Sequence, residues 1–581
     1  MMVSPSKIKV VFHSNYSRMK TGFGKNMRNV LLALHDDPDI EVIEASNGAS
    51  FGADLKTPWK SYGTLPSCPS KIAEIGGDSG KMSLASYGYY QIDEIIDDCD
   101  ADVYVGIEDI WGFGGFGQKK FWNEIPTVIW TTLDSEPIVE EAFEMSKNCD
   151  KLFVWASFSE KILKEKGYPN VETLHGAIDY SFFKPLPNKK EIRRSKGLDD
   201  CFLMGFVFKN QLRKSAPNLI DAFIKVKERN PEINPKLLLH TNWGETDRGW
   251  DIPRYIKEKG LDPKDILATH ICTKCEDYVI SEHHSEDRDC PSCGSKKSLK
   301  QKTSELGLSE EKLNEIYNCM DLYTHPFTSG GQEIPIQEAK AAGLVTLVTE
   351  YSCGLDSCYE HQGGIPLKWH EYREITSQFI KASTCPQDIC DKVEMFLAMS
   401  KQDQIGLAEK GEAYVKENFS IKKMAARLKE TILELHSTTE KVKKEKTEVS
   451  PVDYWDTVLD KEASDRILLV MPESAGDVFM ITSLFPSIKE SYPDKDLYFA
   501  TKKSFFSIVE GNPYVHKVLE FSSSMENLPL MEGAGSQKGY FHLCFLPHIG
   551  TQRMLDYLHQ GDGDNIMFDI KTENFKNTHV S

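Results

Sequence analysis

Residues 324–350 read THPFTSGGQEIPIQEAKAAGLVTLVTE, a stretch that predicts a tight turn, a helix and a buried strand in that order. Gly330 and Gly331 form the turn, and Pro335 stands in the first turn of the helix, where proline is favoured. Such a turn presents backbone N–H groups and a positive dipole end to an anion. Glu338, one turn into the helix, is placed to accept hydrogen bonds from sugar hydroxyls. An ordinary strand–turn–helix without a ligand is the alternative.

The length and composition set the broad class of protein. A chain of 581 residues predicts roughly three to four domains, and its 40% hydrophobic and 27% charged residues are typical of a soluble globular protein. The net charge of -19 disfavours a general nucleic-acid-binding surface. No apolar run is long enough for a membrane span, and the N-terminus lacks the apolar core of a secretory signal. The 14 cysteines fit reduced thiols, so we expect a cytoplasmic protein.

Alternating strands and helices predict a first α/β half. A strand at 7–13 leads through a loop with Gly22 and Gly24 into a helix, which is the first unit of a doubly wound domain. The other expected elements are strands at 103–107, 126–131 and 151–155 and helices at 138–146 and 160–166. We interpret the segment 47–86, which is rich in Gly, Ser and Pro, as long loops over one face.

A second alternating region follows the first. Its expected strands are 202–207, 236–240 and 322–324, and its expected helices are 218–227, 252–259 and 310–318. The turn and helix of 330–343 complete this half, and helices are expected again over 401–435. Two such halves in series predict a cleft between them, with ligands at the carboxyl ends of both sheets.

Seven pieces in a fixed order carry a family resemblance. They are TGFGK (21–25), DSEP (134–137), CDKLFVWASFS (149–159), HGAIDYSFFKP (175–185), KNQLRK (209–214), YNCMDLY (317–323) and PIQEAKAAG (335–343). Together they resemble the retaining GT-B glycosyltransferases that include bacterial mannosyl- and glucosyltransferases, over roughly residues 7–435. The resemblance implies an α/β protein of two Rossmann-like, doubly wound domains that face a cleft.

The resemblance also implies roles for single residues. Lys209 and Lys214 match the basic pair that holds the donor's diphosphate, where cations would stabilise a departing nucleoside diphosphate; a solvated basic loop is the alternative. Asp134 falls in the loop after the fourth strand, where relatives often place a catalytic His or Asp; a structural cap is the alternative. The residues expected to bind the donor are Gly22, Gly24, Lys209, Lys214, Gly330, Gly331, Gln332, Glu333, Ile334 and Glu338.

The chain departs from the family pattern at one position. The family helix carries a second carboxylate eight residues before the one that matches Glu338, and here that position is Gly330. In relatives this group contacts the donor sugar near the reacting carbon. Backbone N–H groups with the amide of Gln332 are one substitute, whereas Glu333 lies three residues later and does not simply take over.

An insertion in the second half predicts a metal site. Cys272 and Cys275 form one CxxC hook, and Cys290 and Cys293 form a second after fourteen intervening residues. Four thiolates at this spacing suit a structural, tetrahedral Zn²⁺ with no open position for catalysis. Unligated cysteines or a redox pair are the alternatives. The resemblance implies no catalytic divalent metal, because cationic side chains and helix N–H groups do that work.

The last part of the chain begins a new α/β pattern. The expected elements are strands at 466–471 and 497–500 and helices at 479–490 and 505–510. With Gly-Asp-Val around Asp477 and NPYVHKV at 512–518, this module is similar to the first half of the heptosyltransferases, in which the matching aspartate is the proposed general base. No second half follows, so acceptor recruitment or oligomerisation is a stronger interpretation than a second activity.

These observations lead to one interpretation of the whole chain. The expected parts are an acceptor-side domain (1–178), a donor domain (179–400) with a zinc-knuckle insertion (270–298), helices crossing back (401–436), a linker (437–464) and a heptosyltransferase-like half-domain (465–581). The expected activity is transfer of a hexosyl or pentosyl group from a nucleoside diphosphate sugar to an acceptor hydroxyl, with retention. The acceptor is a glycan in the favoured version and a modified DNA base in another. A catalytically inactive sugar-nucleotide-binding scaffold is a third alternative.

Overall fold

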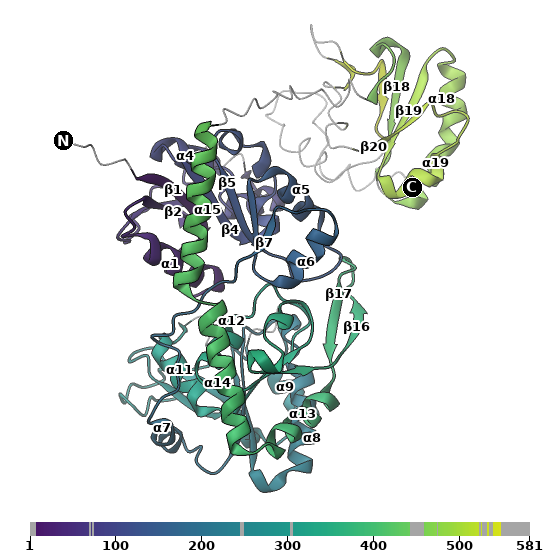
Figure 1. The fold of residues 1–581 in the computed structure, drawn as a ribbon. Helices are drawn as coiled ribbons and strands as arrows, with labels where there is room; N and C mark the ends of the chain where they lie inside the picture. The colour runs from purple at the N-terminus through teal and green to yellow at the C-terminus, as the bar shows by residue number, and fades with distance from the viewer. Residues whose placement is uncertain are drawn as a thin grey trace, which may run out of the picture. The chain divides into compact units, whose positions relative to one another are not determined.

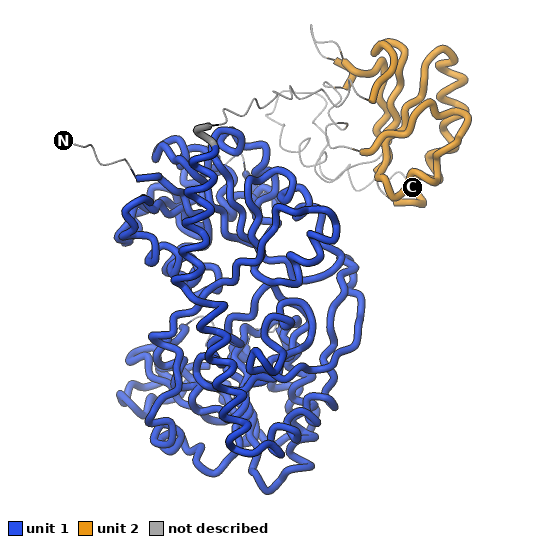
Figure 2. The backbone as a smooth tube through the Cα atoms, viewed as in Figure 1, with its two compact units in different colours: residues 1–445 blue, residues 446–581 orange. Residues whose placement is uncertain are grey.

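The computed structural model describes residues 7–68, 71–72, 75–244, 249–301, 306–441, 458–472, 474–521, 525, 531–533 and 539–547. The chain divides into two compact units, residues 1–445 and 446–581 (Figure 2). The first unit contains two large sheets flanked by helices (Figure 1). No helix among these residues combines the length and the apolar character needed to cross a membrane.

The first sheet has seven parallel strands in the order β3-β2-β1-β4-β5-β6-β7. Their bounds are Ile8–Asn15 (β1), Ile40–Ser50 (β2), Lys60–Leu65 (β3), Val103–Asp109 (β4), Thr127–Thr132 (β5), Lys151–Val154 (β6) and Val171–Thr173 (β7). The helices of this half are Gly22–Leu34 (α1), Ser79–Ser86 (α3), Ile92–Cys99 (α4), Glu140–Asn148 (α5) and Ser157–Glu165 (α6). Since all strands run one way, their carboxyl ends meet at a single edge, as the doubly wound prediction requires.

Residues 47–86 do not form the long loops that the sequence suggested. Strand β2 continues to Ser50, β3 pairs with it in parallel, and α3 closes the segment within the described residues. The reason is that β3 pairs with the buried part of β2, where Ile43 faces Lys60 and Ala45 faces Tyr62, so pairing in the sheet outweighs the turn-rich composition. Asp134 consequently follows the fifth strand, β5, rather than the fourth.

The second sheet has eight strands, with β11-β10-β9-β8-β13-β14-β15 in order and β12 paired to β10. The bounds are Phe202–Val207 (β8), Pro235–His240 (β9), Ile266–Cys272 (β10), Tyr278–Glu282 (β11), Leu299–Lys300 (β12), Leu322–His325 (β13), Thr346–Thr349 (β14) and Gly364–Leu367 (β15). Its helices are Lys189–Ser195 (α7), Ala216–Arg229 (α8), Ile252–Glu258 (α9), Glu310–Cys319 (α11), Ile334–Ala341 (α12) and Pro386–Ala398 (α13). Only β11 and β12 run antiparallel, and both belong to the insertion.

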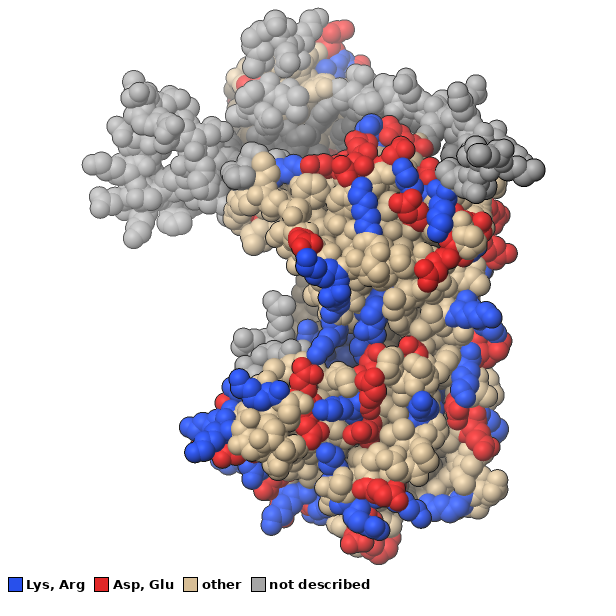
Figure 3. Space-filling view, turned by 90° about the vertical axis from the view of Figure 1, so that its left-hand side faces the viewer, with Lys and Arg blue, Asp and Glu red and all other residues tan. Residues whose placement is uncertain are grey.

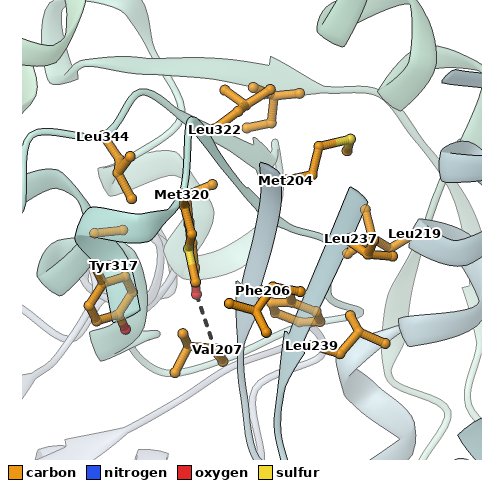
Figure 4. Packing of buried hydrophobic residues seen from close by; sticks show 14 of the residues in the cluster. Met204, Phe206, Val207, Leu219, Leu237, Leu239, Tyr317, Met320, Leu322 and Leu344 are labelled. Carbon is orange, nitrogen blue, oxygen red and sulfur yellow. Dashed lines mark hydrogen bonds between the residues drawn. The ribbon is translucent and has the colours of Figure 1, made fainter. Parts of the chain in front are cut away.

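Packing in the second half explains why its strands read as apolar runs. Met204 and Phe206 of β8 and Leu237 and Leu239 of β9 are fully buried on neighbouring strands, with Leu219 of α8 beside them (Figure 4). A parallel sheet covered by helices on its faces needs such continuous hydrophobic strands.

Three further elements join the two halves. The antiparallel hairpin of β16 (Trp369–Arg373) and β17 (Ile380–Thr384) reaches the first half, where the Ile380 N–H donates to the Glu136 carbonyl at 2.6 Å. Helix α14 (Lys401–Asn418) lies on the second half, and α15 (Ile421–Lys441) runs along α1 of the first (Figure 1). Leu428 and Ile432 of α15 are buried in the core of the first sheet.

Helix α15 is longer than the sequence suggested. It continues to Lys441, past the predicted end at residue 435, and residues 442–457 of the expected linker lie outside the described residues.

The second unit contains a four-stranded parallel sheet in the order β20-β19-β18-β21. The bounds are Arg466–Val470 (β18), Asp496–Thr501 (β19), Lys517–Glu520 (β20) and Leu543–Phe545 (β21). The helix expected over 479–490 is in fact two, Ala475–Ile481 (α17) and Phe485–Ser491 (α18), followed by Phe506–Val509 (α19). Pro486 stands in the first turn of α18, where it starts a new helix instead of continuing the old one. Residues 548–581 lie outside the described residues.

Candidate functional site

The predicted glycine turn lies where the carboxyl ends of the two sheets meet. A Cβ atom added to Gly331 would stand 2.3 Å from Thr132 Cβ at the end of β5, so only glycine permits this approach. The Gln332 amide bonds the Gly176 backbone twice, accepting from its N–H at 2.7 Å and donating to its carbonyl at 2.8 Å. Ser352 donates to the Asp134 carbonyl at 2.7 Å. The turn therefore connects the halves, and the Gln332 amide is engaged by the protein.

The amino-terminal glycine loop meets the same place from the first half. Thr21 caps α1, since its hydroxyl accepts the Gly24 N–H at 3.0 Å. A Cβ atom at Gly24 would lie 2.5 Å from the Met19 carbonyl oxygen, which excludes any other residue type. The Cβ position of Gly22 is 3.5 Å from Ile334 Cδ1 at the start of α12. Two predicted donor-binding residues, Gly22 and Ile334, are thus brought together, and Gly24 lies in the same first turn of α1 as Gly22.

Glu338 is buried on α12, with a partner at each carboxylate oxygen. Tyr317 donates its hydroxyl to Oε2 at 2.7 Å, and Lys25 Nζ of α1 lies 3.3 Å from Oε1. Lys25 is also 4.0 Å from Glu310, to which Arg28 donates two hydrogen bonds at 3.0 Å. The carboxylate predicted to bind a ribose is therefore held by Tyr317 and compensated by a lysine of the other half.

The basic loop after β8 divides its cations between solvent and interior. Lys209 is exposed, and the described residues give it no hydrogen bond or ion pair. Lys214 has a side chain only 5% exposed and pairs with Glu333 Oε2. Arg213 donates through Nη1 to Glu333 Oε1 at 2.6 Å and to the Ser329 carbonyl at 3.3 Å. Arg213 lies within the same motif, although the family pattern implies no role for it.

Glu333 is the centre of a buried charge cluster. His325 Nε2 lies 3.1 Å from Glu333 Oε2, and His325 Nδ1 lies 2.9 Å from the Tyr323 hydroxyl. Burial alone would raise the pKa of Glu333, but Lys214 and Arg213 hold it well below its usual range. Burial lowers the pKa of Lys214 to about 8, with Arg213 acting in the same direction and Glu333 opposing it. Burial also lowers the pKa of His325 to about 4 against the effect of Glu333, so His325 is neutral at pH 7.

The space in front of Gly330 is filled by Glu333. A Cβ atom at Gly330 would lie 2.5 Å from Glu333 Oε1. A carboxylate thus occupies the region into which a side chain at residue 330 would extend, although it comes from three residues later.

Two carboxyl groups of the first half lie near this cluster. Asp134 follows β5, and Asp109 ends β4, where it accepts a hydrogen bond from Thr132 Oγ1 at 2.5 Å. Burial raises the pKa of Asp109, and the nearby charge of Asp134 raises it further. The hydrogen bond from Thr132 and the positive charge of Arg213 lower it. The sequence motifs do not point to Asp109, although an acidic pair directly after the apolar run of 103–107 marks the carboxyl end of a strand.

Behind Asp109 the first sheet ends in a buried polar network. Asn47 donates to Glu108 Oε1 at 3.1 Å, and its carbonyl oxygen lies 2.8 Å from His13 Nε2. Burial raises the pKa of Glu108 to about 8, with Asn47 opposing the shift. Burial lowers the pKa of His13 to about 4, with Asn47 again opposing it. Both groups are therefore mainly uncharged at pH 7.

The four cysteines of the insertion gather as predicted. Their Sγ atoms all lie within 4.8 Å of one another, with Cys272–Cys293 at 3.8 Å and Cys275–Cys290 at 3.7 Å. A tetrahedral zinc with sulfur ligands at about 2.3 Å requires edges of about 3.8 Å, so the donor set fits. The Lys274 and Cys275 N–H groups donate to Cys272 Sγ at 3.3 and 3.5 Å, which favours a thiolate. His283, which lies between the two pairs of cysteines in the sequence, stacks on Trp243 with 4.8 Å between the ring centroids.

A cavity of about 480 Å³ lies in the first half, lined by the segment after β4 and by α5. Its apolar floor includes Ile110 and Phe113, which follow directly on β4, and Trp122 of a later turn. Its rim carries the Glu140, Glu141 and Glu144 carboxylates of α5 and the Gln118, Asn123 and Asn148 amides. Among the surrounding charged groups, Lys119 and Lys147 pair with Asp93 and Glu144. The cavity thus combines an apolar floor with an acidic rim.

Comparisons with known proteins show the fold. No protein-family model matches the sequence, and no curated protein matches it. Among solved structures, HepE from Anabaena in complex with UDP and glucose matches with a TM-score of 0.52 at 12% identity, covering 74% of this chain and 100% of that one. Sucrose-phosphate synthase from Thermosynechococcus elongatus matches with a TM-score of 0.51 at 12% identity, also covering 74% and 100%. With its two Rossmann-like domains, the chain has the GT-B fold, as predicted, and it carries a further α/β unit.

Proposed function

We propose that this chain is a glycosyltransferase that moves a sugar from a nucleoside diphosphate sugar to an acceptor hydroxyl. One observation carries the proposal: Gly22 of α1, Ile334 at the start of α12 and Glu338 one turn later converge where the two sheets meet. These residues come from two halves of the chain and have the chemistry expected around a sugar nucleotide. The complexes of HepE with UDP and glucose and with UDP-glucose support this choice of donor.

The donor would lie with its ribose at Glu338 and its diphosphate at the basic loop and the start of α12. Ribose hydroxyls would replace Lys25 at Glu338 Oε1, while Tyr317 keeps the other oxygen in place. Lys209 is exposed beside this position and would follow the diphosphate. Figure 3 shows Lys and Arg side chains gathered in the hollow between the two halves of the first unit. With this positive charge, the proposed transfer needs no catalytic divalent metal.

The sugar end of the donor would lie at Gly330 and Glu333. Backbone groups of Gly330 and Gly331 would line it, and the Glu333 carboxylate supplies negative charge near the position of the absent family carboxylate. Asp134 and Asp109 would face the reacting carbon from the other half. Retention of configuration, a hexosyl or pentosyl donor, and the division into domains at 178, 400, 436 and 464 are parts of the same proposal.

The acceptor would enter through the cavity of the first half, whose lining begins at Ile110, the residue after Asp109. Its carboxylate and amide rim suits sugar hydroxyls, and the Glu140, Glu141 and Glu144 carboxylates would repel a phosphate backbone. A glycan is therefore the favoured acceptor and DNA the alternative. Tight binding of duplex or single-stranded DNA in a gel shift at moderate salt would reverse this order.

The four cysteines Cys272, Cys275, Cys290 and Cys293 would hold one structural Zn²⁺. Binding of the metal would stabilise the folded insertion next to β10. The purified protein should contain about one zinc per chain by mass spectrometry of the metal, and the double variant C290S/C293S should contain none. A reducing, cytoplasmic setting is part of the same proposal, because 14 cysteines scattered over so long a chain fit reduced thiols better than a disulfide framework.

The second unit would recruit the acceptor or form an oligomer. Its Asp477 acts as a helix cap, since Ser474 and Asp477 form a capping box at the start of α17. Phe479 and Met480 on the same helix are 70% and 66% exposed, which suits a contact surface.

A donor screen tests the proposal directly. Thermal shifts with UDP, GDP, ADP and CDP sugars should identify one stabilising base, and incubation with that donor should release the nucleoside diphosphate. E338Q should lose most of the shift, whereas the control E409Q, an exposed change of the same type on α14, should keep it. Binding of nucleotides without hydrolysis or transfer would support the inactive scaffold instead. No binding of any of the four would reject the proposal.

A further inference from the structure

The loop from Lys209 to Lys214 offers three cations to an incoming anion, and the structure separates them by their contacts. The family resemblance assigns the diphosphate to Lys209 and Lys214 and gives Arg213 no part. The question is which of Arg213 and Lys214 has donors left for a ligand.

Lys214 is buried and forms its ion pair inside the protein. Its side chain is 5% exposed and that of its partner, Glu333, is 3% exposed. Glu333 Oε2, which accepts from Lys214, also lies 3.1 Å from His325 Nε2. If Lys214 turned toward a phosphate, a buried carboxylate would lose its nearest cation, and such a separation is strongly unfavourable. Lys214 therefore stays with Glu333 when a ligand arrives.

Arg213 has the opposite distribution of contacts. Its side chain is 40% exposed, and its two hydrogen bonds, to Glu333 and to the Ser329 carbonyl, both use Nη1. Within the described part of the chain, Nε and Nη2 have no hydrogen-bond partner. The positive charge of the guanidinium also lowers the pKa of Asp109, which belongs to the first half. One edge of the group is held by the protein and the other is left for a ligand.

We propose that Arg213, rather than Lys214, is the fixed cation that binds the donor's diphosphate, and that Lys214 is a positioning residue that acts through Glu333. This inference rests on the proposed function. A guanidinium held by Glu333 at one nitrogen can bind two phosphate oxygens through its remaining N–H groups, with little loss of side-chain freedom. Lys214 and His325 fix Glu333, and Glu333 fixes Arg213.

The same geometry assigns a role in the transfer. The bond between the anomeric carbon and the distal phosphate oxygen breaks, and its electron pair remains on that oxygen. The acceptor oxygen bonds to the carbon, and its proton passes to the departing phosphate. Arg213 compensates the negative charge that develops on the leaving diphosphate.

The test compares nucleoside diphosphates with the matching nucleosides, because only the diphosphate can report on Arg213. Isothermal titration would use UDP, GDP, ADP and CDP and the four nucleosides with wild-type protein, R213Q, R213K and K214Q. We expect R213Q to weaken the diphosphate by about 10- to 100-fold and the nucleoside by less than about 2-fold, as for loss of a charge-assisted contact. R213K, which keeps the charge without the planar group, should fall between R213Q and wild type.

K214Q should unfold at a lower temperature, while its ratio of diphosphate to nucleoside affinity stays within about threefold of wild type. The matched control is R229Q, since Arg229 is 43% exposed on α8 and pairs with Asp391 and Glu394 away from the loop. If K214Q does not fold, the titrations of R213Q and R213K are sufficient to test the assignment to Arg213.

The outcomes separate the inference from the proposed function. The assignment to Arg213 would be overturned if R213Q kept the wild-type ratio of diphosphate affinity to nucleoside affinity. It would also be overturned if K214Q lost this ratio while R213Q kept it. Wild-type protein that binds none of the four diphosphates would reject the proposed function itself.

Discussion

The two sheet edges that meet in the first unit handle buried ionisable groups in opposite ways. At the first edge, the described partners of Glu108 and His13 are uncharged, and burial shifts the pKa of each group in the direction that favours its uncharged form. At the second edge, Glu333 is buried together with Lys214 and Arg213, and it stays ionised. Among the residues that the structure describes, cations lie within bonding distance of Glu333 at the second edge, whereas none is found at Glu108 or His13.

This difference agrees with the proposed roles of the two edges, donor binding at the second and acceptor binding at the first. A diphosphate is bound by fixed charge, so the edge that receives it needs cations held in place by a buried carboxylate. An acceptor hydroxyl is bound by neutral or acidic groups, which the first edge supplies. Removing a charged partner at the second edge should therefore lower the free energy of unfolding more than a change of an ionisable group at the first edge.

The largest effect is expected from E333A. Loss of this carboxylate leaves Lys214 buried without its partner, and removing one partner of a buried pair costs about 3–5 kcal/mol. Chemical denaturation at pH 7 measures the free energy of unfolding. The exposed change E371A on β16 is the control and should shift it by less than about 0.5 kcal/mol. A small effect in E333A would show that the second edge does not depend on paired charge.

A pH-dependent effect is expected from E108Q at the first edge. The folded pKa of about 8 lies above the unfolded value of about 4.3, so wild-type stability from this group is complete below the unfolded pKa and is lost as the pH rises through 8. Glutamine does not titrate, so E108Q should gain about 2–4 kcal/mol relative to wild type between pH 5 and pH 8. Denaturation curves at several pH values measure this, and parallel profiles would contradict it. The exposed change E165Q is the control.

A smaller effect is expected where the two edges touch. The Cβ atom of G331A would stand 2.3 Å from Thr132 Cβ, a stiff β-branched residue that cannot simply move aside. We expect a loss of about 1–3 kcal/mol in the free energy of unfolding, as in overpacked sites. G406A is the control, because no atom lies within 4 Å of the added Cβ there. Equal stability of the two variants would mean that the halves do not meet at Gly331.

The smallest effect is expected from K25Q. The pair of Lys25 with Glu338 joins the two halves, but Lys25 is partly open to solvent, so its loss should cost no more than about 1 kcal/mol. Since Lys25 competes with the ribose for Glu338, the variant should bind a nucleoside as well as wild type or better in isothermal titration. K161Q, an exposed change on α6, is the control. Weaker nucleoside binding in K25Q alone would instead make Lys25 part of the binding site.

Much of the fold could be predicted from local patterns. Strand β8 was predicted with its exact bounds, and β9, α9 and α11 to within one residue, because apolar runs and helix periods are local signals. The four-cysteine cluster was predicted from spacing alone. Among the elements that were not predicted are β2 and β3, whose Gly- and Ser-rich ends hide strands that pairing in the sheet stabilises.

The candidate site was predicted only in part. Sequence motifs led to Gly22, Gly24 and Glu338, and the structure brings them together. Motifs could not tell that Gln332 would bond the Gly176 backbone, or that Lys214 would be buried while its neighbour Arg213 stays open. Adjacent residues in a loop have the same local signals, and their exposure depends on residues more than one hundred positions away.

By itself, the sequence determined the α/β class, the two halves, the glycine turn before α12 and the cysteine cluster, since each depends on neighbours along the chain. The tertiary structure decided how the turn of residues 324–350 is used. Gly331 contacts Thr132, Gln332 holds Gly176, and Glu333 fills the space in front of Gly330. These outcomes depend on burial and on opposite charges brought together by the fold, because the free energy of a charge is set by its surroundings in space.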